Sequence, residues 1–345
     1  MVEALSKGTV LVTGVSGFLG SQVAYECLSN GYKVIGSIRS KKSPDKLENL
    51  KKLPNQENLK IVLLDLLNQE AVKEETKEVT GIIHTGVPSP ELIPGLKKAI
   101  AEAKLTIDNL LQACKTNNIK SLVYLSTLST MFSLKTYKYP VNCEDWADDG
   151  AELPRWTQLK TVSERYLWSQ QATVCGDLKL TTIHSELLVG NGGYSNLKYT
   201  KRSILMKLLS DKIPGVPNLQ IAVVDVEDCA RGLFLSMESD VSKGKRYICI
   251  SESLWLKEIA QILSGEFSKY GYKVPLKPMK YCSAKSGGFF MTSLKDVLPY
   301  WNKEFQGDNS LIKQELGIQF KNSNQAIIKH ASALIQAGVV KDKTK

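Results

Sequence analysis

Several features that would place this chain in other classes of protein are missing from its sequence. No stretch approaches the roughly 18 consecutive apolar residues of a membrane-spanning helix, and the first residues lack the apolar run of a signal peptide. The seven cysteines include no Cys-x-x-Cys pair, and their odd number argues against a disulfide framework and against zinc. We therefore expect a cytoplasmic protein without membrane insertion or a metal site, in which Cys27, Cys114 and Cys229 are buried thiols.

Acidic residues are outnumbered, with 35 against 45 basic residues and a net charge of +10, and the excess is concentrated between Lys33 and Lys60. Most lysines in this stretch are expected on a solvated helix face. No nucleic-acid-binding motif and no interleaved aromatic platform accompanies the charge, so we expect no nucleic-acid partner. With 345 residues, 43% of them hydrophobic, and a mean hydropathy of −0.15, the chain can bury a main core and a smaller lobe.

What the sequence does contain is a glycine-spaced turn near its start. Residues 9–20 run from an apolar strand into this turn and then into the start of a helix. Gly14 permits a tight turn, Gly17 lets backbone N–H groups approach a pyrophosphate, and Gly20 lets the helix pack closely on the strand. The positive end of the helix dipole adds to the attraction for phosphate. We interpret the turn as a dinucleotide site; the alternative is a glycine-rich turn that binds no ligand.

Arg39 indicates which dinucleotide is preferred. It directly follows the predicted second strand, where an NAD-binding protein would carry an acidic residue for the ribose 2′-hydroxyl. A guanidinium can instead hold a 2′-phosphate through two parallel charge-assisted hydrogen bonds, and Lys41 and Lys42 stand beside it in the sequence. The sequence therefore predicts NADP(H) rather than NAD(H).

Strand-like and helical patterns alternate through the first half of the chain. The predicted strands are 9–13, 33–38, 60–64, 81–84, 121–126 and 180–184, and the predicted helices are 18–30, 91–117 and 155–172. This alternation predicts an α/β fold with a Rossmann-type doubly wound parallel sheet. Asp65, after the third strand, is interpreted either as a partner of an adenine amino group or as a turn former. His84 ends the fourth strand at the edge that faces a cofactor, although single histidines are more often structural.

Several segments together resemble a known family. The segments are Thr13–Gly20, Tyr32–Ser40, Asp65, His84-Thr85, Leu122–Thr127, Glu144–Trp146 and Val224–Asp228. They resemble the extended short-chain dehydrogenase/reductases, and within them the NADPH-dependent carbonyl reductases that include dihydroflavonol reductases and yeast methylglyoxal reductases. The resemblance covers about 1–265 and fades toward the C-terminus. It implies an NADP(H)-binding Rossmann domain of 1–190 plus 219–249, and a small substrate-binding lobe of 191–218 plus 250–345.

The resemblance also implies a catalytic machinery, from which this sequence departs at one position. Family members use a Ser or Thr that orients the carbonyl, a Tyr that gives the proton, and a Lys four residues later that binds the nicotinamide ribose and lowers the tyrosine pKa. Thr127 matches the hydroxyl and Lys160 the lysine, but Trp156 stands at the tyrosine position, and an indole N–H does not titrate usefully. The cofactor-binding residues implied by the resemblance are Gly14, Ser16, Gly17, Phe18, Leu19, Arg39, Asp65, Leu66, Thr85 and Lys160.

Other residues are hypothetical substitutes for the missing proton donor. Tyr194 and Tyr281 each precede a lysine by four residues, but such spacings arise by chance in a lysine-rich chain and neither lies on the expected helix. Tyr137 and Tyr139 lie nearer, in the loop after the fifth strand.

A second departure from the family lies after the sixth strand. Where family members usually carry Asn-Pro or a similar Pro-containing segment against the nicotinamide, this chain has His184-Ser185-Glu186. Alternate residues of a strand share a face, so His184 and Glu186 are a hypothetical replacement acid/base pair. The simpler interpretation is a strand-end histidine and a loop carboxylate.

Three functions are compatible with these residues. The first is an NADPH-dependent reductase of an aldehyde or ketone, in which water, Thr127, His184 or another group supplies the proton. The second is a catalytically silent NADP(H)-binding protein, a structural subunit or redox sensor, which the loss of the tyrosine favours. The third is an enzyme of the same fold with altered chemistry, such as isomerisation or reduction of a C=C or C=N bond. We favour the first, because the family and the cofactor residues outweigh one lost side chain, although fold alone does not choose among the three.

The expected partner of a reductase is a small-molecule carbonyl substrate. Trp255, Trp301, Phe289, Phe290 and Met291 in the predicted substrate lobe are consistent with an apolar pocket or with an ordinary core. The resemblance is compatible with a monomer or with a homodimer paired through the lysine-bearing helices. A silent protein would instead be a subunit of a larger assembly.

Overall fold

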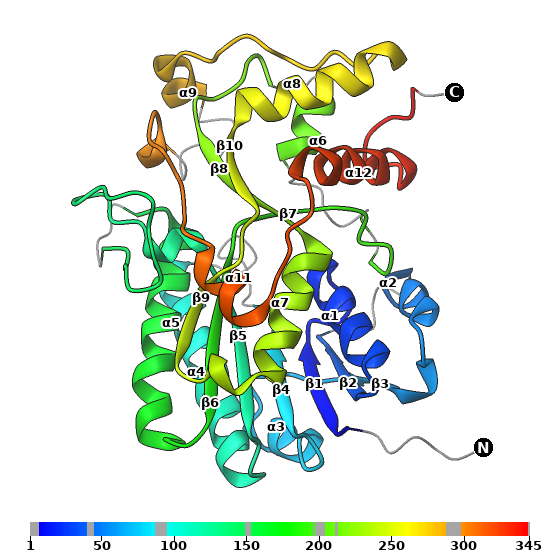
Figure 1. Ribbon diagram of the computed structural model, residues 1–345, viewed down its shortest axis with the longest axis vertical. Coiled ribbons are helices and arrows are strands. Elements are labelled where there is room, and N and C mark those ends of the chain that lie inside the picture. Colours follow the sequence, from blue (N-terminus) through cyan, green and yellow to red (C-terminus); the bar gives the residue numbers. More distant parts are fainter. Residues whose placement is uncertain are drawn as a thin grey trace.

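A parallel sheet of seven strands forms the centre of the molecule (Figure 1). The computed structural model describes residues 7–39, 45–86, 95–148, 153–195, 197, 204–210, 213–287 and 298–343. The strands are β1 (Thr9–Thr13), β2 (Lys33–Ile38), β3 (Leu59–Leu63), β4 (Gly81–His84), β5 (Ser121–Thr127), β6 (Lys179–Ser185) and β9 (Lys245–Ile248). They run in the order β3-β2-β1-β4-β5-β6-β9, and every neighbouring pair is parallel. The predicted doubly wound α/β fold is confirmed, and the six predicted strands agree with the observed ones to within one residue at each end.

Helices cover both faces of this sheet. They are α1 (Phe18–Ser29), α3 (Gln69–Glu75), α4 (Leu96–Thr116), α5 (Arg155–Val174), α7 (Val226–Glu238) and α11 (Ser310–Leu316). α1, α7 and α11 share one hydrophobic core with the sheet, whereas α4 and α5 contribute to another. Side chains alternate in direction along a strand, so Val10 and Val12 of β1 enter the first core and Leu11 enters the second. Because both faces are buried, the strands read as nearly continuous apolar runs.

The three predicted helices are present as α1, α4 and α5. The long middle helix differs at its start, because it begins at Leu96 rather than at residue 91. Gly95 precedes it with φ of 87°, a left-handed conformation that does not continue a right-handed helix. The residues 91–94 lie outside the described part of the chain.

A second, three-stranded sheet lies beyond the carboxyl ends of the main strands, in the upper part of Figure 1. Its strands are β7 (Leu187–Val189), β8 (Gln220–Asp225) and β10 (Glu252–Trp255), and the helices that pack with it are α6 (Ile204–Leu209), α8 (Leu256–Phe267) and α12 (Ser323–Gln336). β8 pairs in parallel with β7 and antiparallel to β10. The chain returns from β8 directly into α7 of the main layer, so the two layers are joined at Asp225, which caps α7.

Short helical segments connect these elements. They are α2 (Asp45–Glu48), α9 (Tyr281–Gly287) and the 3-10 turns Asn49–Lys52, Gln56–Asn58, Leu128–Met131, Asp240–Ser242, Ser268–Tyr270 and Leu298–Tyr300.

The predicted burial of Cys27, Cys114 and Cys229 is confirmed. Trp255 and Trp301 of the apolar group are partly buried, and residues 289–291 lie outside the described chain. Among the described residues, no helix combines the length and the hydropathy that crossing a membrane requires.

Candidate active site

The glycine-spaced turn lies at the carboxyl end of β1 and has the close contacts that its glycines predict. Gly14 has φ of 68°, which only glycine adopts easily. A Cβ atom on Gly20 would lie 2.3 Å from the carbonyl oxygen of Gly14, and one on Gly17 would lie 3.1 Å from the same oxygen. The backbone N–H of Gly17 donates to that oxygen at 2.9 Å. The turn is therefore held against the first turn of α1 at a distance that larger residues would prevent.

The start of α1 keeps its backbone N–H groups free of side-chain caps. The helix begins at Phe18, its first turn contains no acidic residue, and Gly17 at the cap position has no side chain to accept from these groups. Uncapped N–H groups at a helix start form an anion site. The predicted residues Ser16 and Leu19 lie in the same turn. The ring of Phe18 points away toward the second layer, where it packs 5.2 Å from the ring of His330 in α12.

The other predicted cofactor residues follow the carboxyl ends of β2 and β4, which flank β1, and of β3, which pairs with β2. Arg39 is exposed and follows β2 directly, whereas Lys41 and Lys42 lie outside the described residues. Asp65 is exposed, and its Oδ1 accepts from the backbone N–H of Leu67 at 3.0 Å. This contact is the one that the turn-forming interpretation of Asp65 predicts. The adjacent Leu66 contributes its carbonyl oxygen to Asn109 in α4 at 2.8 Å.

Thr85 and His84 are fixed to the end of β1. The hydroxyl of Thr85 donates to the carbonyl oxygen of Thr13 at 2.6 Å, and its N–H donates to the Thr13 hydroxyl at 3.2 Å. The same hydroxyl lies 2.9 Å from Nδ1 of His84. Burial, helped by the positive charge of Lys160, lowers the pKa of His84 to about 3, so the imidazole is neutral. Its Nε2 is buried and has no partner among the described residues.

Lys160 lies on the buried face of α5, 2% exposed, where its amine meets the end of β5. Its Nζ donates to the carbonyl oxygen of Leu125 at 2.8 Å. It also lies 5.3 Å from the ring centroid of Trp156 and 5.2 Å from that of Tyr124, both within cation–π range. Burial lowers the pKa of Lys160 to about 8, against the opposing effect of nearby Glu164 and Glu186. The spacing of four residues thus places Trp156 and Lys160 together, one helical turn apart.

Trp156 belongs to a small apolar cluster between α5 and α4. Its partners there include Ala99, Ala103 and Leu159. The indole therefore fills a packed space and brings no titratable group to Lys160.

The four tyrosines that are hypothetical substitutes contact other parts of the chain. Tyr194 stacks on Tyr25 of α1 at 5.3 Å, and exposed Tyr281 packs against Trp301. The hydroxyl of Tyr137 bonds the backbone of Glu304, and Tyr139 is 45% exposed. None of these contacts involves Thr127 or Lys160.

Thr127 ends β5, and its hydroxyl faces Glu186 rather than solvent. The hydroxyl donates to Oε2 of Glu186 at 2.5 Å, and the backbone N–H of Ser129 donates to the same oxygen at 3.2 Å. Burial raises the pKa of Glu186, although Thr127, Ser129 and the charge of Lys160 oppose this change. The residue lies between the end of β6 and the start of β7, where strand alternation is interrupted.

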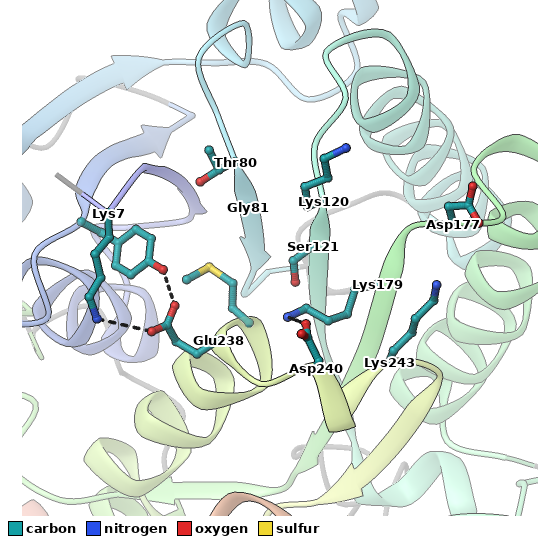
Figure 2. Close-up of a pocket in the computed structure, with 12 residues that line it drawn as sticks. Lys7, Thr80, Gly81, Lys120, Ser121, Asp177, Lys179, Glu238, Asp240 and Lys243 are labelled. Carbon is teal, nitrogen blue, oxygen red and sulfur yellow. Dashed lines mark hydrogen bonds and ion pairs between the residues drawn. The ribbon is translucent and has the colours of Figure 1, made fainter. Parts of the chain in front are cut away.

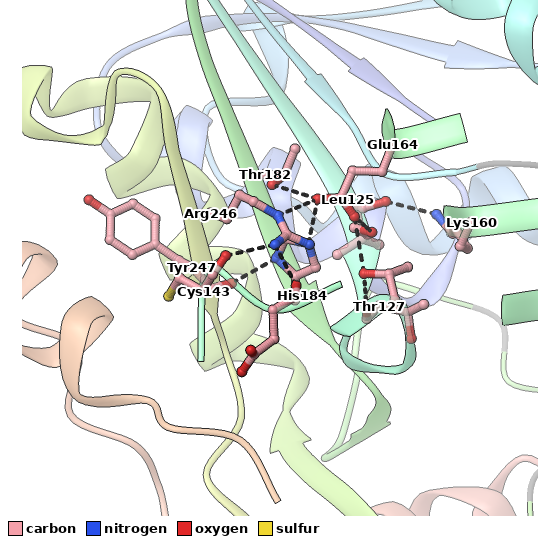
Figure 3. A network of polar contacts seen from close by, with 12 residues as sticks. Leu125, Thr127, Cys143, Lys160, Glu164, Thr182, His184, Arg246 and Tyr247 are labelled. Atoms are coloured by element: carbon pink, nitrogen blue, oxygen red, sulfur yellow. Dashed lines mark hydrogen bonds and ion pairs between the residues drawn. The ribbon is translucent and has the colours of Figure 1, made fainter. Parts of the chain in front are cut away.

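His184 takes part in a separate network around Glu164, which is itself fully buried (Figure 3). Its Nε2 lies 2.8 Å from Glu164 Oε1, and its Nδ1 lies 3.2 Å from the carbonyl oxygen of Tyr247. The hypothesis that His184 and Glu186 form one acid/base pair is therefore wrong, because the two side chains bond different groups on either side of the strand break. A carbonyl only accepts, so Nδ1 carries a hydrogen, and a second hydrogen must lie between Nε2 and Glu164.

Glu164 is the hub of this network, and sequence reasoning missed it. It receives five side-chain contacts, from Ser126 (2.5 Å), Thr130 (3.1 Å), Thr182 (3.3 Å), His184 (2.8 Å) and Arg246 (2.8 Å). Burial alone would raise the pKa of Glu164, but His184, Arg246 and Ser126 outweigh it and hold the pKa well below its usual range. An available signal was its spacing, since Glu164 lies one helical turn after Lys160 on the same helix face.

Tyr300 is a second residue that the sequence did not indicate. Its hydroxyl lies 3.3 Å from that of Thr157, the neighbour of Trp156, and the side chain is 9% exposed. It reaches α5 from a segment 143 residues further along the chain, so no local pattern in the sequence predicts the contact.

A hollow of about 460 Å³ lies at the opposite, amino-terminal edge of the main sheet (Figure 2). Gly81 and Ser121, the first residues of β4 and β5, line it together with lysines and acidic residues. Lys7 pairs with Glu238 there and Lys179 pairs with Asp240. None of the predicted site residues lines this hollow, so the candidate active site remains at the carboxyl edge. Within the described residues, no group of three or more His, Cys, Asp or Glu side chains is placed to hold a metal ion.

Comparison with known proteins agrees with this geometry. Residues 10–249 match the NAD dependent epimerase/dehydratase family. The chain belongs to this family. It is 30% identical over 274 residues to tetraketide alpha-pyrone reductase 1 of Arabidopsis thaliana, covering 76% of this chain and 82% of that protein. It is 27% identical over 303 residues to dihydroflavonol 4-reductase of Zea mays, covering 82% and 83% of the two chains.

Solved structures show the same fold. The chain is similar to yeast methylglyoxal/isovaleraldehyde reductase Gre2 complexed with NADPH, with a TM-score of 0.75 and 20% identity over 95% of this chain and 98% of that one. The predicted resemblance to the extended short-chain dehydrogenase/reductases and the dihydroflavonol reductase group is thereby confirmed. Membership in the epimerase/dehydratase family supports the predicted class of NADP(H)-dependent oxidoreductase.

The residues of this family member fit a bound dinucleotide. A side chain on Gly20 would clash with the turn and one on Gly17 would be crowded, the start of α1 lacks a cap, and Arg39 is exposed at the end of the neighbouring strand. The buried Nε2 of His84 lacks a partner that a polar ligand at this edge would supply.

Proposed function

We propose that this chain is an NADPH-dependent reductase of an aldehyde or ketone. The observation that carries the proposal is the joint placement of an uncapped glycine turn and of Thr127 and Lys160 at one carboxyl edge of the sheet. The names of the relatives support it, since each relative quoted above is a reductase.

Each residue has a distinct role in this proposal. The turn of Gly14, Ser16, Gly17, Phe18 and Leu19 holds the pyrophosphate through backbone N–H groups. Other parts of the cofactor are held by Arg39 at the 2′-phosphate, Asp65 and Leu66 near the adenine, Thr85 beside the nicotinamide, and Lys160 at the ribose. When bound, NADPH supplies hydride to the carbonyl carbon. Thr127 directs its hydroxyl to the carbonyl oxygen, and Trp156, in place of the tyrosine, closes the apolar side of the site.

A second candidate function is that of a silent NADP(H)-binding protein. It is favoured by Trp156, which occupies the usual proton-donor position in a packed apolar cluster. A turnover screen separates the two functions: the protein is incubated with NADPH and a panel of aldehydes and ketones, and loss of absorbance at the nicotinamide band is followed. Tight NADPH binding without turnover of any carbonyl would support the silent protein.

The preference for NADPH gives a direct prediction at Arg39. Replacing Arg39 by Ala should remove a bidentate charge-assisted contact of about 1.5–3 kcal/mol and weaken NADPH binding tenfold or more. NADH lacks the 2′-phosphate, so its affinity should barely change. Titration of both cofactors by calorimetry measures this difference. The matched control is Lys33→Ala, which removes an exposed cation at the opposite end of β2 and should leave both affinities unchanged. Equal affinities for the two cofactors in the unmodified protein would contradict the assignment.

A further inference from the structure

Glu186 occupies a position that joins the proposed carbonyl site to solvent. It lies in the single-residue break between β6 and β7, at the carboxyl edge of the main sheet. Its Oε2 accepts from the Thr127 hydroxyl at 2.5 Å and from the Ser129 N–H at 3.2 Å. Thr127 is 4% exposed and Glu186 is partly exposed. The one side-chain hydroxyl that the proposed mechanism aims at substrate is therefore already bonded to a carboxyl group.

The second oxygen of Glu186 is not used by the fold. Within the described part of the chain, Oε1 accepts no hydrogen bond, although Oε2 accepts two. By contrast, both oxygens of Glu164 accept hydrogen bonds and none of that residue is exposed. A structural carboxylate is bonded at both oxygens, whereas Glu186 leaves one oxygen available to exchange protons with water.

The groups that face Glu186 set when it holds a proton. Thr127, at the end of β5, and Ser129, in the turn after it, are neutral hydrogen-bond donors. Lys160 of α5 contributes a positive charge, and Tyr300 of the C-terminal segment contributes a phenol. Lys160 favours the ionised form of Glu186, and burial favours the protonated form and is the larger influence. A carboxyl group with a raised pKa is a suitable general acid near neutral pH.

We propose that Glu186 supplies the proton that reduces the carbonyl oxygen, and that it does so through the hydroxyl of Thr127. This inference rests on the proposed reductase function. As hydride from NADPH forms a C–H bond at the carbonyl carbon, the π electrons of the C=O bond move to oxygen. When Glu186 is protonated on Oε2, its contact with Thr127 is reversed: Oε2 donates to Thr127 Oγ1, and the Thr127 hydroxyl donates to the carbonyl oxygen. That oxygen takes the proton of Thr127 Oγ1, which in turn takes the proton of Glu186 Oε2. The carbonyl is reduced to an alcohol and NADPH is oxidised to NADP⁺. The Glu186 carboxylate regains a proton from solvent at its free oxygen, and a half-turn of the carboxyl group brings the protonated oxygen back to Thr127.

Two other groups are poorer proton donors on geometric grounds. His184 is enclosed by Glu164 and the Tyr247 carbonyl and is 0% exposed. Tyr300 bonds Thr157 rather than Thr127, and burial raises the pKa of its phenol. A phenol serves this chemistry only when a nearby cation lowers its pKa, and Tyr300 has the opposite shift.

The central experiment compares Glu186→Gln with unmodified protein, using a carbonyl that the turnover screen identifies. Glutamine keeps the size and accepts from Thr127 but carries no transferable proton, so kcat should fall about 10²–10⁴-fold. NADPH affinity, measured by titration, should stay within twofold, because Glu186 is not assigned to the cofactor. Glu252→Gln, at an exposed position in β10, is the matched control and should leave kcat unchanged.

A rescue variant tests whether the loss is one of proton donation. Adding Trp156→Tyr to Glu186→Gln restores a phenol one turn before Lys160, whose charge lowers a phenol pKa. The double variant should recover at least tenfold in kcat.

The pH profile gives an independent signature. A general acid must hold its proton, so kcat/KM of the unmodified protein should fall tenfold per pH unit above the pKa of Glu186, which lies above its ordinary 4.5. Glu186→Gln should lose this limb and keep only the decline caused by Lys160 losing its charge, and this decline should begin below pH 8 because the variant removes the Glu186 charge that raises the Lys160 pKa.

A measurement without turnover completes the test. In protein labelled with ¹³C at the glutamate carboxyl carbons, the signals of Glu26 and Glu186 should both titrate above pH 4.5, and the Glu186 signal is the one that disappears in Glu186→Gln and shifts in Thr127→Val. The shift in Thr127→Val identifies the Glu186 signal, so the raised pKa can be measured even if Glu186→Gln does not fold. An unchanged kcat in Glu186→Gln, failure of the rescue, or titration of the Glu186 signal at or below 4.5 would each overturn the role of Glu186. Failure of the unmodified protein to bind NADPH would instead overturn the proposed function.

Discussion

Replacing Glu164 by glutamine is expected to lower the free energy of unfolding by about 3–5 kcal/mol, the usual cost of breaking a buried ion pair by removing one partner. The carboxylate is 0% exposed, and Arg246 and His184 both donate to its Oε1 at 2.8 Å. A glutamine oxygen can accept from both donors, but it carries no charge to balance Arg246, and the glutamine NH₂ group faces the hydroxyls of Ser126 and Thr130 as a further donor. Urea denaturation of the two proteins measures the difference.

The pH dependence of unfolding distinguishes loss of this charge from loss of packing. Because the folded pKa of Glu164 lies below its ordinary 4.5, its stabilisation is fully present above about pH 4.5 and is lost as pH falls through the folded pKa. Glu164→Gln should lack this part of the acid destabilisation. The matched control is Glu258→Gln, which changes an exposed helix-capping carboxylate in α8 and should cost about 1 kcal/mol or less. Equal costs for the two variants would contradict the role of Glu164 as a buried hub.

Replacing Gly20 by alanine is expected to destabilise the protein by about 1–3 kcal/mol and to reduce NADPH binding at least tenfold. The new Cβ would lie 2.3 Å from the Gly14 carbonyl oxygen, which is backbone and has no alternative rotamer. The glycine turn must shift away from α1, and the N–H groups that hold the pyrophosphate shift with it. Thermal unfolding and NADPH titration measure the two effects.

Gly265→Ala is the control for the Gly20 variant. Gly265 lies inside α8, and a Cβ atom there meets nothing within 4 Å. Alanine has the higher helix propensity, so this variant should be neutral or stabilised by about 1 kcal/mol, with unchanged NADPH affinity. NADPH affinity in Gly20→Ala equal to that of Gly265→Ala would show that the turn does not position a nucleotide.

The main sheet was predictable because its signals are local. Each strand from β1 to β6 is a short apolar run bounded by glycine or polar residues, and the crossover rule orders such runs into a parallel sheet. The second sheet was not predicted, since β7 has three residues and β10 has four. β8 was expected with the nucleotide-binding part but pairs with both of these strands. Pairing between segments so far apart in the chain leaves no periodic signal.

The candidate site divides in the same way. The glycine turn and Arg39 were accessible to sequence reasoning because motif spacing and a strand end mark them, and Thr127 and Lys160 were accessible through the family resemblance. Glu164 and Tyr300 were not, because their importance comes from side chains brought together from distant segments. Glu186 was noticed as one half of a pair with His184, and the strand break between β6 and β7 separates the two. Alternation along a strand predicts a shared face only while the strand continues.

The burial of Lys160 has a thermodynamic consequence for the whole fold. Its pKa of about 8 in the folded chain lies below the ordinary 10.5, so between these pH values the unfolded chain binds more protons at this position than the folded chain. By proton linkage, stability rises with pH across that window, and at neutral pH the buried ammonium opposes folding by about 3 kcal/mol. A methionine of similar length at residue 160 should therefore give a more stable protein. The charge of Lys160 therefore serves ligand binding and lowers the stability of the fold that buries it.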